Sequence, residues 1–505
     1  MKNKKLKFLA STLVIFAATA SLTSCGGGVA NAGEEFAMKT LNDLKEASSE
    51  SNPIQVEFWH SFGHNISSNL DPLIESFEEE MKAQNIYINV KATSVGGGYD
   101  GLRSRVNLGT KSNSIPTMLL GYPDHFADYI DSGILLPLDE YVNSTDTNIG
   151  LTGDYAWNDF IESYRTENQL EMNGKSIIAC IPFNKSTEVM YYNATAVDPI
   201  LQEKGFLDEN GKWSNPTWDE LWQVSEALKT KVNSASGLIY TTNKEVTKKS
   251  DYPVYIDSGA NFFITTARQW AESEEAAKAV YTTRDNEGGK VTFKNSTTLA
   301  VQQYFKEKAD QGLWNIPDKV SQSYGSSLVA IGQAFISIGS TAGANNNNSD
   351  KFELKCTTMP QKDKTNGVKA VIQQGTNCAI LSKNSNNLTR LASWLLIRYL
   401  TSTENTTTFS MGTGYLPVRE SAKNSDRFKS FLTTDDIFSG AAPKCLNAAY
   451  DELSYFYTDI AFSGSSIVRD TVDTMIQSIY CQNKDINAAM TDAYNELKDF
   501  NIRCE

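Results

Sequence analysis

Residues suited to metal or acid–base chemistry are few in this sequence. It has only 3 His, against 22 Tyr, 23 Phe and 8 Trp. His60 and His64 are four residues apart, a spacing that on a helix would place two metal ligands on one face. Gly63 stands between them, the segment follows a predicted strand, and no nearby group of Glu, Cys or His completes a ligand set. We therefore expect no metal site.

Motifs of catalysis are missing as well. With 60 Asp and Glu residues, carboxylate pairs are inevitable, whereas glycoside hydrolysis needs two carboxylates at a set separation across one bond. The sequence has no Gly-x-Ser-x-Gly elbow and no metalloprotease helix motif. The glycine run Gly96–Gly98 lacks the Lys-Ser/Thr of a nucleotide loop. We expect a protein without catalytic residues or cofactor. An exported glycoside hydrolase stays the alternative, and turnover of a bound ligand distinguishes the two.

Aromatic rings and short polar side chains are what the sequence offers instead. A polyhydroxylated ring has apolar C–H faces and many hydroxyl groups. A site for it needs flat aromatic side chains for stacking and small polar groups for hydrogen bonds. The alternative for each aromatic residue is a place in the hydrophobic core. The candidate aromatic residues are Trp59, Tyr99, Tyr122, Trp157, Trp270, Trp314 and Tyr415.

Length and composition set the broad class. A chain of 505 residues is expected to form two or three domains. Hydrophobic residues make up 40% and charged residues 21%, which excludes a disordered chain and a polytopic membrane protein. The net charge of −14 disfavours nucleic acid and anionic lipid surfaces as partners.

The order of predicted elements indicates an α/β fold. Residues 54–59 alternate as a strand, residues 70–82 carry apolar side chains at helical spacing, and residues 86–90 alternate again. A strand, a helix and a strand in this order predict a parallel pair covered by a helix. Later in the chain we expect amphipathic helices over 467–479 and 486–500 and an exposed loop over Asn345–Asn348.

The first residues are similar to an export signal with a lipid attachment site. Four lysines within residues 2–7 precede the apolar stretch Phe8–Ala20, which is too short to span a bilayer comfortably. Leu22-Thr23-Ser24-Cys25 resembles a bacterial lipobox. We expect residues 1–24 to be a lipoprotein signal peptide and residues 25–52 a flexible tether from a lipidated Cys25. An ordinary signal peptide is the alternative.

Six stretches, in order along the chain, resemble the extracellular solute-binding proteins of the carbohydrate ABC-importer type. The maltose-binding and sn-glycerol-3-phosphate-binding proteins belong to this group. Each stretch is weak alone, but together they span residues 54 to about 500. They are EFWHSF at 57–62, DSGILLPLD at 131–139, PFNKSTEVMYYN at 182–193, PTWDEL at 216–221, GQAFISIGS at 332–340 and GTGYLPV at 412–418.

The resemblance implies an α/β, two-lobed periplasmic-binding-protein-like (type II) fold, with a hinge and a ligand cleft between the lobes. Closure of such a hinge around a ligand is a two-state motion. The implied division is 53–187 plus 340–401 for the N-terminal lobe and 188–339 plus 402–505 for the C-terminal lobe, with chain crossings near 187–191, 336–340 and 401.

The resemblance also implies which residues contact the ligand. Arg469 matches an arginine that contacts the ligand in the glycerol-3-phosphate branch and occurs in plain sugar-binding relatives. Its guanidinium suits phosphate or carboxylate, or a sugar oxygen. The implied set is Tyr99, Tyr415, Trp59, Trp157 and Trp270 for stacking, Asp124, Ser186, Thr187 and Ser340 for hydroxyl groups, Gly375 for a backbone contact, and Arg469.

By the same resemblance, the protein is expected to be the substrate-binding subunit of an ABC importer. It would capture a carbohydrate outside the cell and deliver it to the permease subunits in the membrane. The alternative within the same fold is sn-glycerol-3-phosphate or a glycerophosphodiester as ligand. We expect a monomer on the outer face of the cell membrane, held there by its lipid anchor alone and without a nucleic acid partner.

Overall fold

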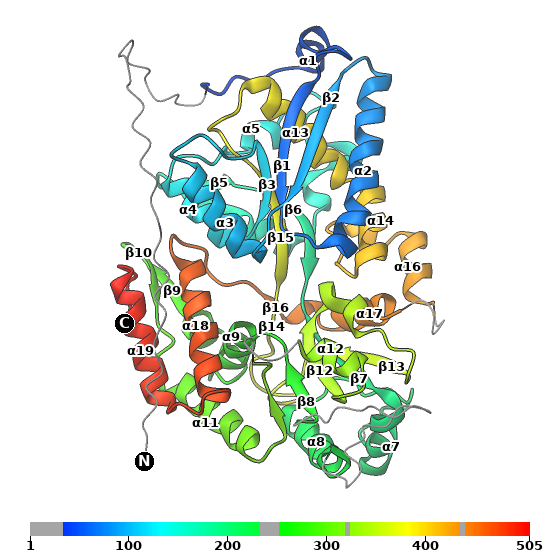
Figure 1. Cartoon of the computed structure of the whole chain (residues 1–505), viewed down its shortest axis with the longest axis vertical. Helices are drawn as coiled ribbons and strands as arrows, with labels where there is room; N and C mark the ends of the chain where they lie inside the picture. Colours follow the sequence, from blue (N-terminus) through cyan, green and yellow to red (C-terminus); the bar gives the residue numbers. More distant parts are fainter. Residues whose placement is uncertain (1–33, 233–251, 319–323, 435–439) are drawn as a thin grey trace, which may run out of the picture. The chain divides into compact units, whose positions relative to one another are not determined.

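The computed structural model describes residues 34–232, 252–318, 324–434 and 440–505. The expected signal peptide and Cys25 lie outside these ranges. Five strands form the first sheet: β1 (Ile54–His60), β2 (Ile88–Ser94), β3 (Met118–Gly121), β6 (Ile181–Ser186) and β15 (Gln374–Ile380). Their order is β2-β1-β3-β15-β6 (Figure 1). β1 is parallel to β2 and β3, whereas β15 is antiparallel to β3 and β6.

Helices cover both faces of this sheet. α2 (His64–Ala83), α13 (Asn387–Leu400) and α14 (Thr403–Thr413) pack on one face, and α3 (Gly98–Gly109) and α4 (Pro123–Asp131) on the other (Figure 1). Side chains alternate along a strand. Phe58 of β1 therefore packs against the face covered by α2, α13 and α14, and Trp59 against the face covered by α3 and α4. The predicted strand–helix–strand unit is confirmed, although α2 begins at His64 rather than near residue 70. Its buried residues are Leu70, Leu73, Ile74, Phe77 and Met81.

The second sheet repeats the plan of the first. Its strands are β7 (Glu188–Asn193), β8 (Val254–Ile256), β11 (Trp314–Asn315), β12 (Ile336–Ser340) and β13 (Leu354–Thr358), in the order β11-β8-β12-β7-β13. β8 is parallel to β11 and β12, and β7 is antiparallel to β12 and β13. The helices packed with it include α8 (Trp218–Val232), α9 (Gly259–Gln269), α11 (Ser296–Asp310), α18 (Ser465–Tyr480) and α19 (Ile486–Asp499). The last two confirm the predicted late helices.

Among the described residues, two adjacent links lead from the first sheet toward the second, one directly and one through a separate two-stranded sheet. Thr187 alone separates β6 from β7, and Gln373 alone separates β14 (Val371–Ile372) from β15. The Thr187 hydroxyl donates to the carbonyl oxygen of Ile372 at 3.0 Å, so the links are tied together. β14 pairs in parallel with β16 (Phe456–Tyr457). The first link lies within the chain crossing expected near residues 187–191. The second link, at Gln373, lies at none of the expected crossings.

The predicted division of the chain is wrong in two places. β13 was expected in the N-terminal lobe but pairs with β7 in the second sheet. The chain therefore does not cross near 336–340. α14 was expected in the C-terminal lobe but packs beside α2, because Phe409 lies against Phe62 and Phe183 of the first sheet's core.

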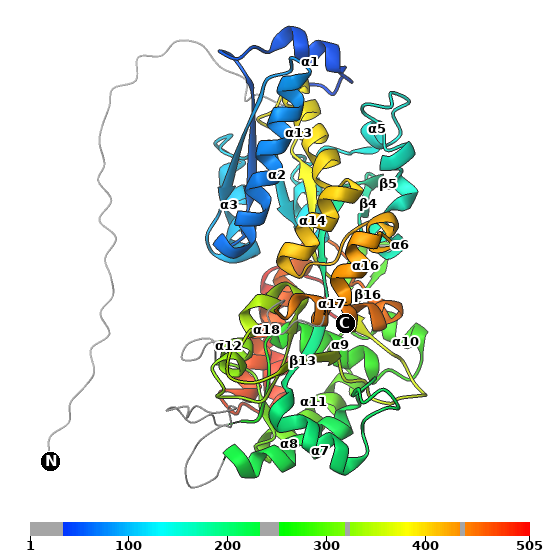
Figure 2. The same cartoon turned by 90° about the vertical axis from the view of Figure 1, so that its right-hand side faces the viewer.

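Residues 34–52 are not a flexible tether. They include α1 (Leu41–Ala47), which begins with a capping box between Thr40 and Asp43. Leu44 is fully buried and Phe36 packs edge-on against Tyr141. α1 lies near the start of α13 (Figure 2), where the backbone N–H of Ala37 donates to Asn387. The segment was predicted to be a tether because its few apolar residues stand among many polar ones in the sequence.

The asparagine run is exposed at Asn345, Asn346 and Asn348, as expected, but most of it is not a loop. It belongs to a 3-10 helix, η3 (Thr341–Asn347), in which Asn347 is buried. The Ser337 hydroxyl donates to Asn347 at 3.0 Å, and Asn348 accepts from the backbone N–H of Ala441 at 2.7 Å. The amide oxygens accept hydrogen bonds from groups outside the run, and composition alone does not reveal this.

The remaining elements are short or connect the two sheets. Within the described residues, no helix is long and apolar enough to cross a membrane. The other helices are α5 (Asp139–Val142), α6 (Glu162–Glu167), α7 (Ala194–Lys204), α10 (Glu274–Ala279), α12 (Gly325–Ala330), α15 (Glu420–Lys423), α16 (Asp426–Leu432) and α17 (Ala442–Asp451), and two hairpins are formed by β4 (Gln169–Met172) with β5 (Lys175–Ile178) and by β9 (Thr282–Asp285) with β10 (Gly288–Val291).

Candidate functional site

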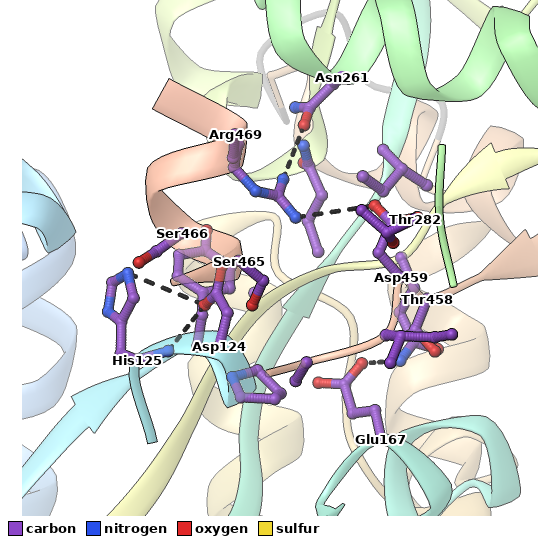
Figure 3. Close-up of a pocket in the computed structure, with 18 of the residues that line it drawn as sticks. Asp124, His125, Glu167, Asn261, Thr282, Thr458, Asp459, Ser465, Ser466 and Arg469 are labelled. Carbon is purple, nitrogen blue, oxygen red and sulfur yellow. Dashed lines mark hydrogen bonds and ion pairs between the residues drawn. The ribbon is translucent and has the colours of Figure 1, made fainter. Parts of the chain in front are cut away.

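A pocket of about 770 Å³ is lined by residues from the elements of both sheets. From the first sheet come the starts of α3 and α4, the end of α6 and the start of β15. From the second come α9, the β9 strand and the start of α18 (Figure 3). The volume is within the range of small-molecule sites. Its aromatic lining consists of Tyr99, Tyr122, His125, Tyr281 and Tyr324.

Three helices begin at this pocket, and the residue at the start of each explains why the helix begins there. Gly97 has φ +86° directly before α3, a conformation that favours glycine. Pro123 occupies the first turn of α4, where its missing N–H is no loss. Gly464, with φ +89°, precedes α18. The pocket therefore receives Tyr99, Asp124 and Ser465 from the first turns of three helices.

Arg469 lies on α18 and points into the pocket (Figure 3). One guanidinium nitrogen donates to Oδ1 of Asn261 at 3.1 Å, and another lies 4.0 Å from Oδ2 of Asp459. Burial alone would lower the pKa of Arg469, but the carboxylates of Asp124 and Asp459 outweigh it and raise the pKa above its ordinary value. The arginine is therefore charged at every physiological pH.

A second polar group surrounds His125, whose imidazole is nearly fully buried. Its Nε2 lies 3.7 Å from Asp100 and 3.8 Å from Asp124. The backbone N–H of His125 donates to Asp124 at 2.9 Å. Hydrogen bonding to His125 is the main reason why the pKa of Asp100 is lowered. Two carboxylates are thus fixed at the pocket wall as hydrogen-bond acceptors.

The third polar group is a buried network beside the links between the sheets. Lys185 is completely buried and forms an ion pair with Glu167, whose side chain is 6% exposed. Glu167 also accepts hydrogen bonds from Gln373 and Asn377. Because Glu167 and Gln373 line the pocket, this network connects the pocket wall to the link at Gln373.

Four residues of the implied ligand-binding set line the pocket. They are Tyr99, Asp124, Gly375 and Arg469. Gly375 has φ +96°, and a Cβ there would lie 2.0 Å from the carbonyl oxygen of Asn184, so no other residue fits. Burial raises the pKa of Tyr99, while hydrogen bonds with Tyr415, Thr376 and Asn184 oppose the rise. Tyr415 therefore contacts Tyr99 from behind rather than lining the pocket.

The other small polar residues of the set lie outside the pocket lining. Ser186 and Thr187 are buried at the first link between the sheets. The Ser340 hydroxyl caps η3 by accepting from the backbone N–H of Ala342 at 3.2 Å. Ring packing holds Tyr415 against Phe409 and Phe62.

None of the four candidate tryptophans lines the pocket. Trp59 packs with the α3 and α4 side of the first sheet, under the guanidinium of Arg105, which lies 5.1 Å from its ring centre. Trp157 packs on Phe160, and Trp270 on Tyr304 and Phe305. Trp314 is fully buried. The core explanation of these aromatic residues fits their observed positions.

Several lining residues carry no motif in the sequence. Asn261, Glu167 and Asp459 come from three separated segments and meet only through the fold. Asp459 follows β16 (Phe456–Tyr457) closely and precedes Arg469, which the resemblance indicated, by ten residues. Asn261 and Glu167 gave no comparable signal.

Two sheets of the same plan, joined at adjacent links and sharing a ligand-sized pocket, define a two-lobed binding protein. The family described as bacterial extracellular solute-binding protein matches residues 73–433 of this sequence. The chain belongs to this family, and the predicted resemblance and fold class are confirmed. No curated protein sequence matches the chain.

Solved structures of the same fold share little sequence with the chain. UgpB from Mycobacterium tuberculosis, in complex with glycerophosphocholine, has a TM-score of 0.65 and 20% identity, over 88% of this chain and 97% of its own. Maltose-bound MalE3 of T. maritima has a TM-score of 0.64 and 14% identity, over 88% and 100%. MalE from Bdellovibrio bacteriovorus bound to maltotriose has a TM-score of 0.63 and 18% identity, over 87% and 97%.

Proposed function

We propose that the protein is the substrate-binding subunit of an ABC importer and captures a carbohydrate outside the cell. The observation that carries this proposal is the pocket, which combines tyrosine rings with fixed carboxylate, amide and hydroxyl groups. Rings and short polar groups together suit the two faces of a sugar. Its relatives named for maltose and maltotriose support the same ligand class.

The ligand is proposed to act by favouring approach of the two lobes. Residues from both line the pocket, and a ligand that contacts both favours the arrangement in which both sets of contacts form. Permease subunits in the membrane are the proposed recipients. The protein is proposed to have no catalytic activity, so that a bound ligand is released unchanged.

A glycerophosphodiester is the second candidate ligand. It is favoured by the similarity to UgpB, whose structure contains glycerophosphocholine, and by the presence of Arg469 in the pocket. Attachment to the outer face of the membrane through a lipidated Cys25 is proposed from the sequence around it.

A thermal-shift screen of the purified protein tests the ligand class. The panel contains mono- and oligosaccharides, glycerol-3-phosphate and its diesters. A ligand at a hundred times its dissociation constant stabilises the folded state by about 2.7 kcal/mol. Stabilisation by a saccharide, with the saccharide recovered intact, supports the proposal. Stabilisation by glycerol-3-phosphate alone moves the protein to the second candidate, and release of a cleaved product contradicts the absence of catalysis.

A further inference from the structure

We infer that this pocket selects an uncharged, polyhydroxylated ligand and rejects anions. The reason is that the groups able to bind an anion already hold carboxylates of the protein itself. This inference rests on the proposed function and deepens it, because it assigns the ligand to one of the two candidate classes. It also identifies Asp459 as a residue that determines specificity.

The positively charged or protonatable side chains of the pocket come first. In the described part of the chain, two arginines and one histidine line it. Each faces a carboxylate, and the second nitrogen of Arg284 also donates to the carbonyl oxygen of Ala461 at 2.8 Å. The pairs are Arg469 with Asp459 at 4.0 Å, Arg284 with Glu171 at 3.1 Å, and His125 with Asp124 at 3.8 Å.

Helix N-termini are the other features that attract anions, and three meet here. α3 has Asp100 in its first turn and α4 has Asp124, whose Oδ1 accepts from the N–H of His125. At α18 the carboxylate of Asp128 accepts from the N–H of Gly464 at 3.0 Å. It reaches across from α4 to do so. The positive ends of the helices are therefore already matched by internal carboxylates.

The remaining charge of the lining is negative. Among the described residues it has five carboxylates and two arginines. Glu167 is matched by the buried Lys185 behind it. Glu171 and Asp459 face the two arginines. The two carboxylates of the lining that remain are Asp100 and Asp124, and they share one histidine. Just outside the lining, Arg103 also faces carboxylates, because it lies 3.3 Å from Asp470 and 3.9 Å from both Asp100 and Asp128.

Such an arrangement suits hydroxyl groups better than phosphate. A carboxylate oxygen accepts a hydrogen bond from a ligand O–H, whereas a phosphate dianion offers it no donor and only repulsion. Among these carboxylate oxygens, Oδ2 of Asp459 is the best placed to accept a hydrogen bond from a ligand hydroxyl. It is buried, and no described residue donates a hydrogen bond to it. A phosphate that approached Arg469 would meet Asp459 and Asp124 at the same time.

The test uses an isosteric change that removes one charge. Asp459→Asn keeps the side-chain volume and leaves Arg469 with one carboxylate fewer. Asp124→Asn is a second variant of the same kind, in case the first does not fold. The matched control is Asp154→Asn, which makes the same chemical change at an exposed residue outside the pocket. Binding of inorganic phosphate, glycerol-3-phosphate and a panel of neutral oligosaccharides is measured by calorimetry on each purified protein.

The parent protein and the control are expected to show no binding of either anion. Asp459→Asn is expected to gain affinity for glycerol-3-phosphate by about tenfold or more, as removal of a nearby repulsive charge predicts. Anion binding by the parent overturns the inference. Failure of folded variants to gain anion affinity overturns the role of the carboxylates. The results with the anions do not depend on the oligosaccharides. If no oligosaccharide of the panel binds, the proposed carbohydrate ligand is contradicted, whereas the inference about anions is not.

Discussion

Arg103 of α3 and Asp470 of α18 form an ion pair, with 3.3 Å between Nη2 and Oδ2. The pair joins a helix of the first sheet to a helix of the second at the edge of the pocket. Arg103 also donates to the hydroxyl of Ser466, and Asp128 accepts from Ser463 at 3.2 Å beside it. These contacts form only when the two lobes are together, so they stabilise the arrangement in which ligand touches both.

Arg103→Ala is therefore expected to weaken ligand binding without removing a lining residue. Apparent affinity falls with the fraction of protein in the binding-competent arrangement, and we expect a loss on the order of tenfold. Calorimetry with the ligand found in the screen measures it. Arg105→Ala is the matched control, since Arg105 lies on the same helix but over Trp59. Equal affinity for the two variants would contradict the role given to Arg103.

Glu188 is expected to make stability depend on pH. It is buried, and Oε1 accepts from Asn261 at 3.1 Å, while Oε2 has no donor among the described residues. Burial raises its pKa from 4.5 to about 8. Between these pH values the folded chain keeps a proton that the unfolded chain has released. Its contribution to stability is therefore lost as pH rises through this window and levels off above about 8.

Glu188→Gln removes this dependence. Relative to the parent, the variant should gain stability from near zero at pH 4 to on the order of 3 kcal/mol at pH 7. Urea unfolding at a series of pH values measures the difference. Glu203→Gln, exposed on α7, is the control and should follow the parent at each pH. A variant whose stability runs parallel to the parent's from pH 4 to 8 would show that Glu188 ionises freely.

Trp270 is expected to matter for stability and not for the ligand. It packs on Tyr304 and Phe305, outside the pocket lining. Trp270→Ala should lower the free energy of unfolding by about 3 kcal/mol, as for other large-to-small changes in a core, with unchanged affinity. Tyr99→Ala, within the lining, should lower the affinity for the ligand. Urea unfolding measures the stability of each variant, and calorimetry measures its affinity for the ligand. A loss of affinity in Trp270→Ala would show that Trp270 does stack on the ligand.

Leu44 tests whether the segment before β1 belongs to the folded protein. Its side chain is fully buried. Leu44→Ala should therefore destabilise by about 2–4 kcal/mol, with Leu41→Ala, whose side chain is half-buried, having a smaller effect. Differential scanning calorimetry measures both. Unchanged melting temperatures would be the behaviour of a tether.

Elements with strong periodicity could be predicted from the sequence. β1, α2, α18 and α19 were located because their buried residues repeat at strand or helix spacing. The division of the chain was predicted less well, since β13 and α14 are assigned by pairing partners distant in sequence. η3 was missed because the side chains of Asn347 and Asn348 accept hydrogen bonds from Ser337 and Ala441, contacts that composition does not encode.

The site could be predicted only in part, for a similar reason. Tyr99 and Asp124 follow parallel strands at the edge where their loops meet, and Gly375 and Arg469 stand in segments that resemble the family. The tryptophans were misplaced because ring type says nothing about which face of an element a side chain occupies. Asn261 and Glu167 reach the pocket from helices without any motif.

Calorimetric titration of the purified protein with neutral oligosaccharides and, separately, with glycerol-3-phosphate and its diesters tests the central claim most directly. The account predicts saturable binding of a neutral saccharide, its recovery unchanged, and no binding of the phosphorylated compounds. Saturable binding of a phosphorylated compound with no response to any saccharide would contradict it and would make Arg469 the anchor of an anion.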